Sequence, residues 1–579
     1  MAKAVWRPLT AAILLTGVLV AGCTTQAPPP GPAGASPAAG AAQTQPTPGV
    51  KVPDASLRAA SPSPQTAAGA VGQPARTGSP SPVAAAPRAE PSGRFIYVWN
   101  VAISPAWFDP QENQQLLTPY GFQYAIHDAL VKHMPNQPLA PSLAESYEIA
   151  SDFRSATFRL REEITFHNGD PVTTEDVKWT YENYRGANAK LLKDKTERIE
   201  TPDARTIRFM FNEPFLDFPL LYGSPASGAG WIVPAKYYQQ VGPDGFKRAP
   251  IGAGPYKYVR LAGDELELEA FSAYWRKSPS IKTLIMRGVP EATTRLAQIQ
   301  TGEADVVQSL TGPLLDVAKS DPNLQLAVVR SSAEWLEFTG WEKPDNPFHD
   351  VKVRQAASLA LDRQAISQAE EGGLSSFEGN WIPENWPGAI QRPMPEFDQD
   401  RARQLLAEAG FPNGFDIEQL TPLPPYTALG ERVVTQLREV GIRVGRVNAM
   451  DRGAFTAKLS EGPDAFGRGI ILHFSASPGD AASRIRAFAI CGGSTSRTCV
   501  PEIDERFRRY EASFDPRERE TILNDLQNYI LDQYIFVPLY RQSFVSAVGP
   551  RMANRWDEVM GAVPQYVYIG PYEDVRLKE

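Results

Sequence analysis

One long stretch without aromatic residues limits which part of the chain can fold. No Phe, Tyr or Trp occurs between Cys23 and Phe95, and Ala, Pro, Gly, Ser and Thr dominate this stretch. A segment of this composition cannot bury enough apolar surface to offset the entropy of ordering it. Its prolines favour an extended chain. We therefore expect residues 23–93 to form a disordered, Pro/Ala-rich tether, and folded structure to begin at residue 94.

The first 22 residues have the features of an export signal. Lys3 and Arg7 are positively charged, and an apolar run follows them from Ala11 to Ala21. The run is too short to span a bilayer, so residues 1–22 are predicted to be a cleaved signal peptide. The segment Leu19-Val20-Ala21-Gly22-Cys23 resembles the lipobox of bacterial lipoproteins, which implies that Cys23 is acylated and anchors the chain to a membrane. An ordinary signal peptide with a chance cysteine is the alternative.

Length and charge narrow the functions open to the rest of the chain. The 579 residues are enough for two or three large cores, and 42% hydrophobic with 21% charged residues is typical of a globular protein. The net charge of −8 leaves no basic excess to neutralise phosphates, so we expect no nucleic-acid partner. With five histidines in all, little is available for a metal site, and we expect no metal and no cofactor.

Only two cysteines follow Cys23. Cys491 and Cys499 enclose a stretch that begins Gly492-Gly493-Ser494-Thr495-Ser496. In an exported chain, two cysteines in one short polar loop predict a local disulfide. A metal site there is poorly supported, because no histidine or further cysteine lies nearby in the sequence.

The folded part mixes strand and helix patterns, which indicates an α/β fold. Apolar residues alternate as in half-buried strands at Phe158 and Leu160, at Ile164 and Phe166, and over 207–211. The apolar run 535–539 predicts another strand. Thr173 is placed to cap a helix, and further helices are predicted at 292–301, 353–369, 401–409, 430–440 and after Asp515.

Several short motifs follow one another along nearly the whole folded part. The most specific is Phe166-His167-Asn168-Gly169-Asp170-Pro171-Val172-Thr173, which continues into Glu175-Asp176-Val177. The others are Phe108-Asp109-Pro110-Gln111, Pro141-Ser142-Leu143-Ala144-Glu145-Ser146, Gly254-Pro255-Tyr256, Gly302-Glu303-Ala304-Asp305, Val353-Arg354-Gln355-Ala356, Leu405-Leu406-Ala407-Glu408-Ala409-Gly410-Phe411 and Val537-Pro538-Leu539. From about residue 95 to 545, this ordered series resembles the extracellular solute-binding proteins of family 5. That family includes the oligopeptide, dipeptide and nickel binders of ABC importers.

The resemblance implies an α/β fold with two lobes. It would be a periplasmic-binding-protein-like clamshell of class II type, with an enlarged first lobe and a two-strand hinge. The first lobe would hold residues 94–288 and the returning segment 546–579, and the second lobe residues 289–545. Strands near Arg287–Pro290 and Val537–Ser546 would form the hinge.

The implied function is that of a binding subunit. The chain would capture peptides or similar small solutes outside the cytoplasmic membrane and deliver them to the permease and ATPase subunits of an ABC importer. The energy would come from the ATPase, since this chain contains no Gly-x-x-x-x-Gly-Lys-Ser/Thr loop. We expect a monomer that is not an enzyme.

The segment from His473 to Asp480 is the strongest candidate for ligand contact. Peptide-binding relatives commonly have an Asp here that neutralises the α-amine of the peptide, within a pattern like Trp-x-x-Asp-x-x-Asp-Pro. Phe474 stands at the Trp, Ser477 at the anchoring Asp and Asp480 at the second Asp. We predict that at least one of His473, Phe474 and Ser477 contacts ligand, with core packing as the alternative. Because Ser477 carries no charge, we expect a free N-terminal amine to contribute little, unless Asp480 performs the anchoring.

Three tryptophans are further candidates for the ligand site: Trp107, Trp341 and Trp381. Trp107 precedes the turn at Asp109, and Trp381 lies in a loop that ends at Pro383. Large clefts that accept peptides are lined by aromatic residues. Packing in a core is the alternative for each of the three.

Other classes of protein remain open at this point. A secreted hydrolase would need a motif such as Gly-x-Ser-x-Gly or His-Glu-x-x-His, and the sequence contains neither. A lipoprotein that serves as an adhesin or chaperone could keep the same clamshell. Within the family, a nickel chelate, a sugar or another non-peptide solute is the alternative ligand.

Overall fold

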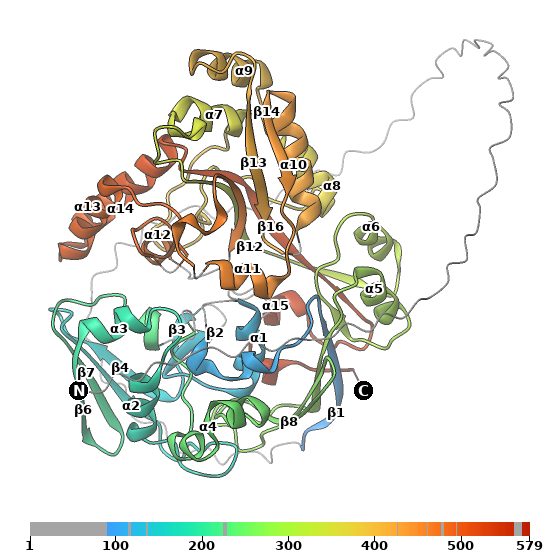
Figure 1. The fold of residues 1–579 in the computed structure, drawn as a ribbon. Coiled ribbons are helices and arrows are strands. Elements are labelled where there is room, and N and C mark those ends of the chain that lie inside the picture. The colour runs from blue at the N-terminus through green and yellow to red at the C-terminus, as the bar shows by residue number, and fades with distance from the viewer. Residues whose placement is uncertain are drawn as a thin grey trace, which may run out of the picture. The chain divides into compact units, whose positions relative to one another are not determined.

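A computed structural model describes residues 90–113, 117–134, 137–223, 228–424, 426–459, 461–475, 480–493, 495–560 and 570–578. The predicted signal peptide, Cys23, the tether as far as residue 89 and Ser477 lie outside the described residues. The strands (Figure 1) are β1 (Ser92–Trp99), β2 (Val131–Met134), β3 (Gln137–Pro141), β4 (Ala144–Ile149), β5 (Ser155–Leu160), β6 (Thr196–Asp203), β7 (Thr206–Phe211), β8 (Tyr256–Ala262), β9 (Glu265–Ala270), β10 (Ile281–Gly288), β11 (Val306–Val307), β12 (Gln325–Thr339), β13 (Phe415–Pro422), β14 (Ile442–Val447), β15 (Gly469–Ser475) and β16 (Phe536–Val548).

The α-helices are α1 (Leu117–Ile126), α2 (Thr174–Asn183), α3 (Ala189–Lys195), α4 (Ala235–Arg248), α5 (Ala292–Gln300), α6 (Pro313–Ser320), α7 (Val351–Leu359), α8 (Arg363–Glu371), α9 (Gln399–Glu408), α10 (Thr427–Glu439), α11 (Arg452–Leu459), α12 (Ala481–Phe488), α13 (Pro501–Ala512), α14 (Pro516–Asp532) and α15 (Trp556–Met560). Two short helical turns are used below, η1 (Pro105–Phe108) and η3 (Pro219–Gly223).

Ten strands form one mixed sheet, in the order β14-β13-β15-β12-β16-β11-β1-β10-β9-β8. β1 pairs in parallel with β10 and β11, and β13 pairs in parallel with β14 and β15. Between these parallel groups, β12 pairs antiparallel with β15 and β16. The predicted strand 535–539 is present as the beginning of β16, which is buried along nearly its whole length.

β12 and β16 run through two separate cores. At one end, Ala327 and Phe544 pack with Tyr97 of β1, and at the other end Trp335 and Phe536 pack in a second core. The two strands pair over 12 residue positions with two shifts of register, one of them between Arg330 and Ser332. We call the part on the first core the first lobe (92–324 and 549–578) and the part on the second core the second lobe (340–535). β12 and β16 belong to both lobes and are the strands that connect them.

This arrangement changes the predicted position of the first hinge strand. Residues 287–288 end β10, which pairs with β1 and β9 inside the first lobe. Helices α5 and α6 then also cover the first lobe, because Leu296, Ile299 and Ala318 pack with Val98 of β1. The first crossing is therefore β12 and not Arg287–Pro290, while the second crossing, predicted at Val537–Ser546, falls within β16.

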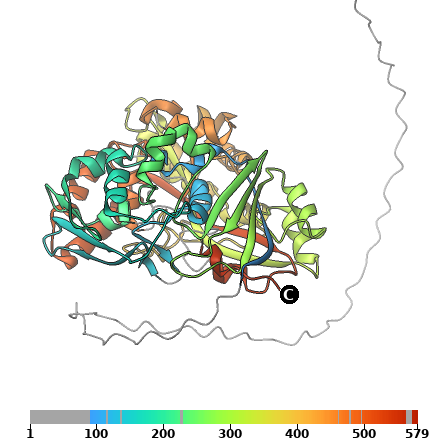
Figure 2. The ribbon, with the colours of Figure 1, turned by 90° about the horizontal axis from the view of Figure 1, so that it is seen from below.

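The first lobe contains a second, four-stranded sheet in the order β4-β5-β7-β6. Phe158 and Leu160 of β5 are buried with Ile207 and Phe209 of β7, as their alternating pattern predicts. Figure 2 shows the teal strands of this sheet and the blue and green strands of the large sheet on opposite sides of the first lobe. The C-terminal residues Trp556, Tyr572 and Val575 pack in the core that contains Tyr97.

Local signals account for the element ends. Thr173 caps α2 by a capping box, in which its hydroxyl accepts from the Asp176 backbone N–H and the Asp176 carboxylate accepts from the Thr173 N–H. Asp515 caps α14 by accepting from the backbone N–H of Arg517. Both helices begin where the sequence predicts.

Two elements differ from the sequence prediction. The single helix expected over 353–369 is divided into α7 and α8, because the carboxylate of Asp362 accepts from the Ala365 N–H and starts a new helix. Ile164 and Phe166 are buried but lie in a turn region that contributes one isolated bridge, Thr165 to Pro171, in place of a strand. The tight turn at Asn168-Gly169 closes this region, and Gly169 has a φ of 88°.

Among the described residues, no helix combines the length and the apolar character required to cross a membrane.

Candidate functional site

The two lobes meet where parallel strands end, and a cavity of about 290 Å³ lies there. Its wall includes Asn100 after β1, Pro290 after β10, Ser309 after β11 and Tyr426 after β13. β16 supplies the remaining side with residues 542–545. In open α/β sheets, ligands bind outside the carboxyl ends of the strands. We call this space the hinge cavity.

Arg295 of α5 holds the first-lobe side of the hinge cavity in place. Its Nε and Nη atoms donate to the carbonyl oxygens of Val289, Pro290, Gln308 and Ser309, at 2.7–2.9 Å. Burial lowers the pKa of this guanidinium to about 10. Because this value is still well above 7, the group stays charged at neutral pH. Ser309 has a φ of 54°, a left-handed conformation that needs such support in a residue other than glycine. The loops after β10 and β11 are therefore fixed to one another.

Buried carboxyl groups lie behind Ser543, a residue of β16 that lines the hinge cavity. Glu371 at the end of α8 accepts from the Ser543 N–H at 2.8 Å and from the Ser375 hydroxyl at 2.6 Å. Burial raises the pKa of Glu371 to about 7. Burial and the nearby Glu371 also raise the pKa of Glu334 on β12. Glu371 thus bonds directly to the backbone of a crossing strand beside the shift of register.

Phe474 is the predicted site residue that lies at the lobe boundary. It is half-buried near the end of β15 and packs against residues of the first-lobe core as well as against a small second-lobe cluster. Its ring lies 4.5 Å from the Tyr426 ring and 6.4 Å from the Phe544 ring, measured between centroids. Tyr426 and Phe544 also line the hinge cavity. Sequence reasoning missed both, because an isolated Tyr after a Pro-Pro pair and a Phe within an apolar strand are indistinguishable from core residues.

His473 points to the opposite side of β15, into the second-lobe core. Only 3% of its side chain is exposed, and its ring stacks on Trp335 at 5.3 Å between centroids. Its Nε2 lies 2.9 Å from an Oε of the equally buried Glu337. Packing, the alternative considered for His473, is what the structure shows.

Two of the three candidate tryptophans are core residues. Trp381 is 0% exposed, with its ring 4.4 Å from that of Phe536, so it does not line a cleft in this conformation. Trp341 is almost fully buried, and its Nε1 donates to the Thr498 hydroxyl. The sequence does not show this burial, because the segments that carry both tryptophans fold back onto the second-lobe core only in the tertiary structure.

The third tryptophan, Trp107 of η1, is half-buried on the first lobe. It stacks on Phe122 at 5.7 Å, and its carbonyl oxygen accepts from the Gln123 amide. These contacts fix its position but leave its predicted role in ligand binding open to test.

Asp480 serves as the N-cap of α12. Its two oxygens accept from the backbone N–H and the hydroxyl of Ser483 at 2.9 and 2.8 Å. Burial and the nearby Asp217 of the first lobe raise the pKa of Asp480 to about 6. Both oxygens are engaged within the helix start, which makes Asp480 a poor anchor for a ligand amine. Ser477 lies outside the described residues.

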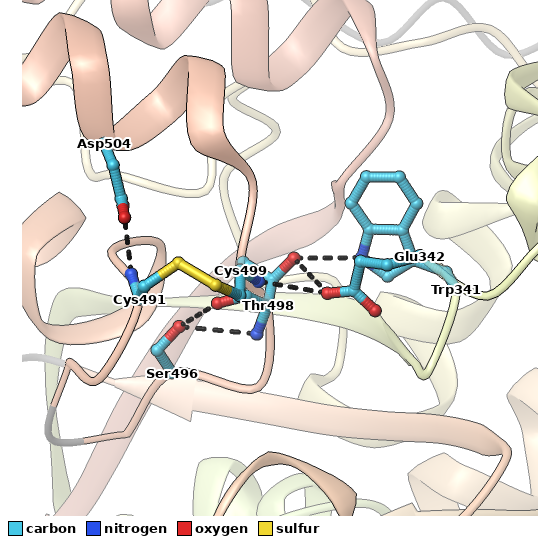
Figure 3. Close-up of a disulfide and its surroundings, with 7 residues drawn as sticks. All are labelled: Trp341, Glu342, Cys491, Ser496, Thr498, Cys499 and Asp504. Carbon is cyan, nitrogen blue, oxygen red and sulfur yellow. Dashed lines mark hydrogen bonds between the residues drawn. A yellow bond between two sulfur atoms is a disulfide. The ribbon is translucent and has the colours of Figure 1, made fainter.

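The predicted disulfide between Cys491 and Cys499 is present, and it closes the loop after α12 (Figure 3). The Cys491 N–H donates to the Asp504 carboxylate on α13, and the Cys499 N–H donates to the Glu342 carboxylate. Thr498 joins the same group, since its hydroxyl donates to Glu342 and accepts from Trp341. The disulfide therefore braces α12, α13 and the loop after β12.

A second cavity, of about 620 Å³, lies at the lobe boundary away from the hinge. Phe153 and Leu216 of the first lobe line it, together with Ile390, Tyr510 and Phe514 of the second lobe. We call this space the mouth cavity. No sequence pattern pointed to it, because its walls come from four segments that lie far apart in the sequence.

Comparison with known proteins identifies the family to which this chain belongs. Residues 138–488 match the bacterial extracellular solute-binding proteins, family 5 middle part. The chain belongs to this family. This confirms the resemblance drawn from the ordered motifs.

Individual relatives agree with the assignment. The solute-binding protein is 30% identical to the glutathione-binding protein GsiB of Pectobacterium atrosepticum, over 76% of this chain and 85% of that protein. It is 24% identical to heme-binding protein A of Haemophilus influenzae, over 81% of this chain and 91% of that protein. A dipeptide-binding protein from Pseudoalteromonas sp. SM9913, solved in complex with Met-Leu, has a similar fold with a TM-score of 0.72. That structure is 20% identical and covers 84% of this chain and 100% of its own. The predicted two-lobed fold is confirmed.

Proposed function

We propose that this solute-binding protein captures a small solute between its two lobes and hands it to the permease of an ABC importer. The observation that carries the proposal is that the hinge cavity and the mouth cavity both take their walls from both lobes. A ligand that contacts both lobes favours the closed state by its differential affinity for that state. Capture and release then need no chemical step in this chain, and the ATPase subunit supplies the energy.

The solute is a peptide or a similar small molecule. The relatives named as glutathione-binding and dipeptide-binding support this class. The aromatic group of Tyr426, Phe474 and Phe544 offers apolar contact beside the hinge cavity. Gln542 lines the same cavity, and its buried Oε1 has no hydrogen-bond partner in the described structure. An amide N–H of a ligand would satisfy that oxygen.

The protein works outside the cytoplasm as a lipid-anchored monomer. Cys23, which follows the small residues of the signal segment, supports the anchor. Metabolic labelling with a fatty acid should mark the wild-type protein and not a Cys23→Ser variant. A labelled Cys23→Ser variant would place the lipid elsewhere.

The ligand is tested by mass spectrometry of small molecules released when the purified protein is unfolded. Peptides in the released fraction, which rebind with a Kd at or below the micromolar range by calorimetry, support the proposal. A heme, metal chelate or sugar would support the same capture mechanism with a non-peptide solute. Hydrolysis of added peptides, without stoichiometric binding of any intact solute, would overturn the proposal in favour of an enzyme.

A further inference from the structure

Four charged residues form a connected network between the lobes, beside the mouth cavity. Arg486 Nη2 lies 2.6 Å from Asp217 Oδ2, and its Nη1 lies 2.6 Å from Glu511 Oε1. Lys195 extends the chain of charges, with its Nζ 3.4 Å from the same Glu511 oxygen and 3.0 Å from Glu213 of its own lobe. We call Lys195, Asp217, Arg486 and Glu511 the mouth network.

The network crosses the boundary twice. Lys195 ends α3 and Asp217 precedes η3, both in the first lobe, whereas Arg486 is on α12 and Glu511 on α13 of the second lobe. In Figure 1, α3 lies below α12 and α13 on the side away from α5 and α6. Asp217 is held in place by its own backbone, because its carbonyl oxygen accepts from the N–H groups of Leu220 and Leu221. The first-lobe surface at α3 and Asp217 therefore meets the second-lobe surface at α12 and α13 through these side chains.

The ion pairs are largely withdrawn from solvent. The side chains of Lys195, Asp217 and Arg486 are each 14% exposed, and the free space among them is about 10 Å³, room for about one water at most. Salt screens such partly buried pairs less than it screens exposed ones. The carboxylates of Asp217 and Glu511 raise the pKa of Arg486, so the guanidinium stays protonated despite its burial.

An aromatic pair adds to the same contact. The rings of Phe153 and Phe514 stack across the lobes, with centroids 6.1 Å apart and planes within 2°. Phe153 is held at a positive φ of 56° by bonds of its N–H to Ala150 and of its carbonyl to Phe215. Phe514 is still 54% exposed with this contact in place, so the stacking covers only part of its ring.

We propose that Arg486 is the centre of a latch that holds the two lobes shut at the mouth, by pairing with Asp217 across the boundary. The inference rests on the proposed capture between lobes. It adds that this latch determines which fraction of the protein is closed when no solute is bound. Opening would separate Arg486 from Asp217 and Lys195 from Glu511, while the pair Arg486–Glu511 would stay within the second lobe. The latch lowers the free energy of closure and so raises the apparent affinity for a solute that binds the closed state.

The test measures the distance between lobes without any solute. Spin labels on Lys193→Cys and Arg509→Cys, exposed positions of α3 and α13, are introduced into the full mature chain with Cys23→Ser. The protein is stripped of solute by reversible unfolding, and double electron–electron resonance reports a short and a long distance. We expect Arg486→Met to shift the ratio about tenfold toward the long distance. Asp217→Asn should have a similar effect alone and little further effect in the Arg486→Met background.

A matched variant controls for the loss of positive charge. Arg519 lines the same 10 Å³ gap, but its guanidinium donates to the Tyr510 and Ser513 carbonyls within the second lobe. Arg519→Met should leave the distance ratio unchanged, and circular dichroism should show all variants folded. The proposal is overturned if the parent shows only the long distance, or if Arg486→Met and Arg519→Met act alike. Either result leaves the capture proposal intact, because retained solute is measured separately by mass spectrometry.

Discussion

The hinge side and the mouth side of the lobe boundary are built from different interactions. At the hinge, β12 and β16 pair along their backbones, and Glu371 and Arg295 bond to backbone atoms of the loops and strands around them. At the mouth, the described residues of the two lobes meet through side chains, chiefly Arg486 with Asp217 and Phe153 with Phe514. The sequence distance differs as well, since Arg486 and Asp217 are 269 positions apart.

Because of this difference, folding stability and lobe closure depend on different parts of the lobe boundary. We expect the backbone pairing of β12 and β16 to persist when the lobes open, so the hinge side contributes to folding stability in both states. If the lobes open as proposed, the contacts at the mouth are lost, so they contribute mainly to the balance between the open and the closed state. Substitutions on the two sides should therefore affect different measurements.

The largest effect is expected from a large-to-small substitution on a crossing strand. Phe536 of β16 is 0% exposed and packs between Trp335 and Trp381. Phe536→Ala should lower the free energy of unfolding by about 3–5 kcal/mol, through lost burial and the cavity left behind. Urea denaturation followed by tryptophan fluorescence measures this change.

Phe514→Ala is the matched substitution at the mouth. Because Phe514 is half exposed and contacts the other lobe, its removal should change unfolding by less than about 0.5 kcal/mol. The same variant should still shift the interlobe distance toward the open state. Equal losses of stability at Phe536 and Phe514 would contradict the division between hinge and mouth.

The disulfide sharpens the comparison, because it braces the two helices that carry Arg486 and Glu511. It closes a loop with a sequence separation of 8, and the Cys491 N–H bonds to Asp504 on α13. The double variant Cys491→Ser with Cys499→Ser should lose about 2–3 kcal/mol of stability, the lower range for a short loop. Thiol titration of the unfolded, unreduced wild-type chain should find neither cysteine free. Unchanged stability in the double variant would show that the surrounding hydrogen bonds alone hold the loop.

Sequence patterns predicted the features whose signals are local. The capping box at Thr173, the alternation in β5 and β7, and the Cys491–Cys499 pair each depend on residues within a few positions of one another. The ordered motifs predicted the family and, through it, the two-lobed fold.

Features that depend on tertiary contacts were missed or misassigned. Trp381 was expected near ligand because of its loop, yet the loop packs onto the core. The crossing was assigned to Arg287–Pro290, because nothing in the sequence shows that α5 and α6 return to the first lobe. The contact between Arg486 and Asp217 has no counterpart in the sequence analysis, since two residues 269 positions apart leave no periodic signal.

A smaller effect is expected from the buried carboxyl group at the hinge. The pKa of Glu371 is raised from 4.5 to about 7 by burial, so the protonated form stabilises the fold. This contribution is fully present below about pH 4.5 and is lost as the pH rises through about 7. Raising the pH from 5 to 8 should therefore lower the free energy of unfolding by about 1–2 kcal/mol.

The titration of Glu371 depends on its charged and titratable neighbours. Glu334 and Tyr540 face it from β12 and β16, Glu370 precedes it on α8, and Arg330 lies near enough to lower its pKa. Glu371→Gln should flatten the pH dependence. Glu431→Gln, at an exposed position of α10, should leave it unchanged. An unchanged slope in Glu371→Gln would assign the titration to Glu334.

The smallest effect concerns the mouth and a second carboxyl group, Asp480. In the closed state its pKa is raised to about 6 by burial and by Asp217, although Arg486 acts in the opposite direction. Opening would remove Asp217, so closure takes up a proton, and the closed fraction should increase as the pH falls from 7.5 toward 5.5. We expect about a twofold change in the interlobe distance ratio, measured with the same spin labels. Asp480→Asn should abolish the change while still capping α12, because Asn is as good an N-cap as Asp. A pH response that persists in Asp480→Asn would place the titrating group elsewhere in the closed mouth.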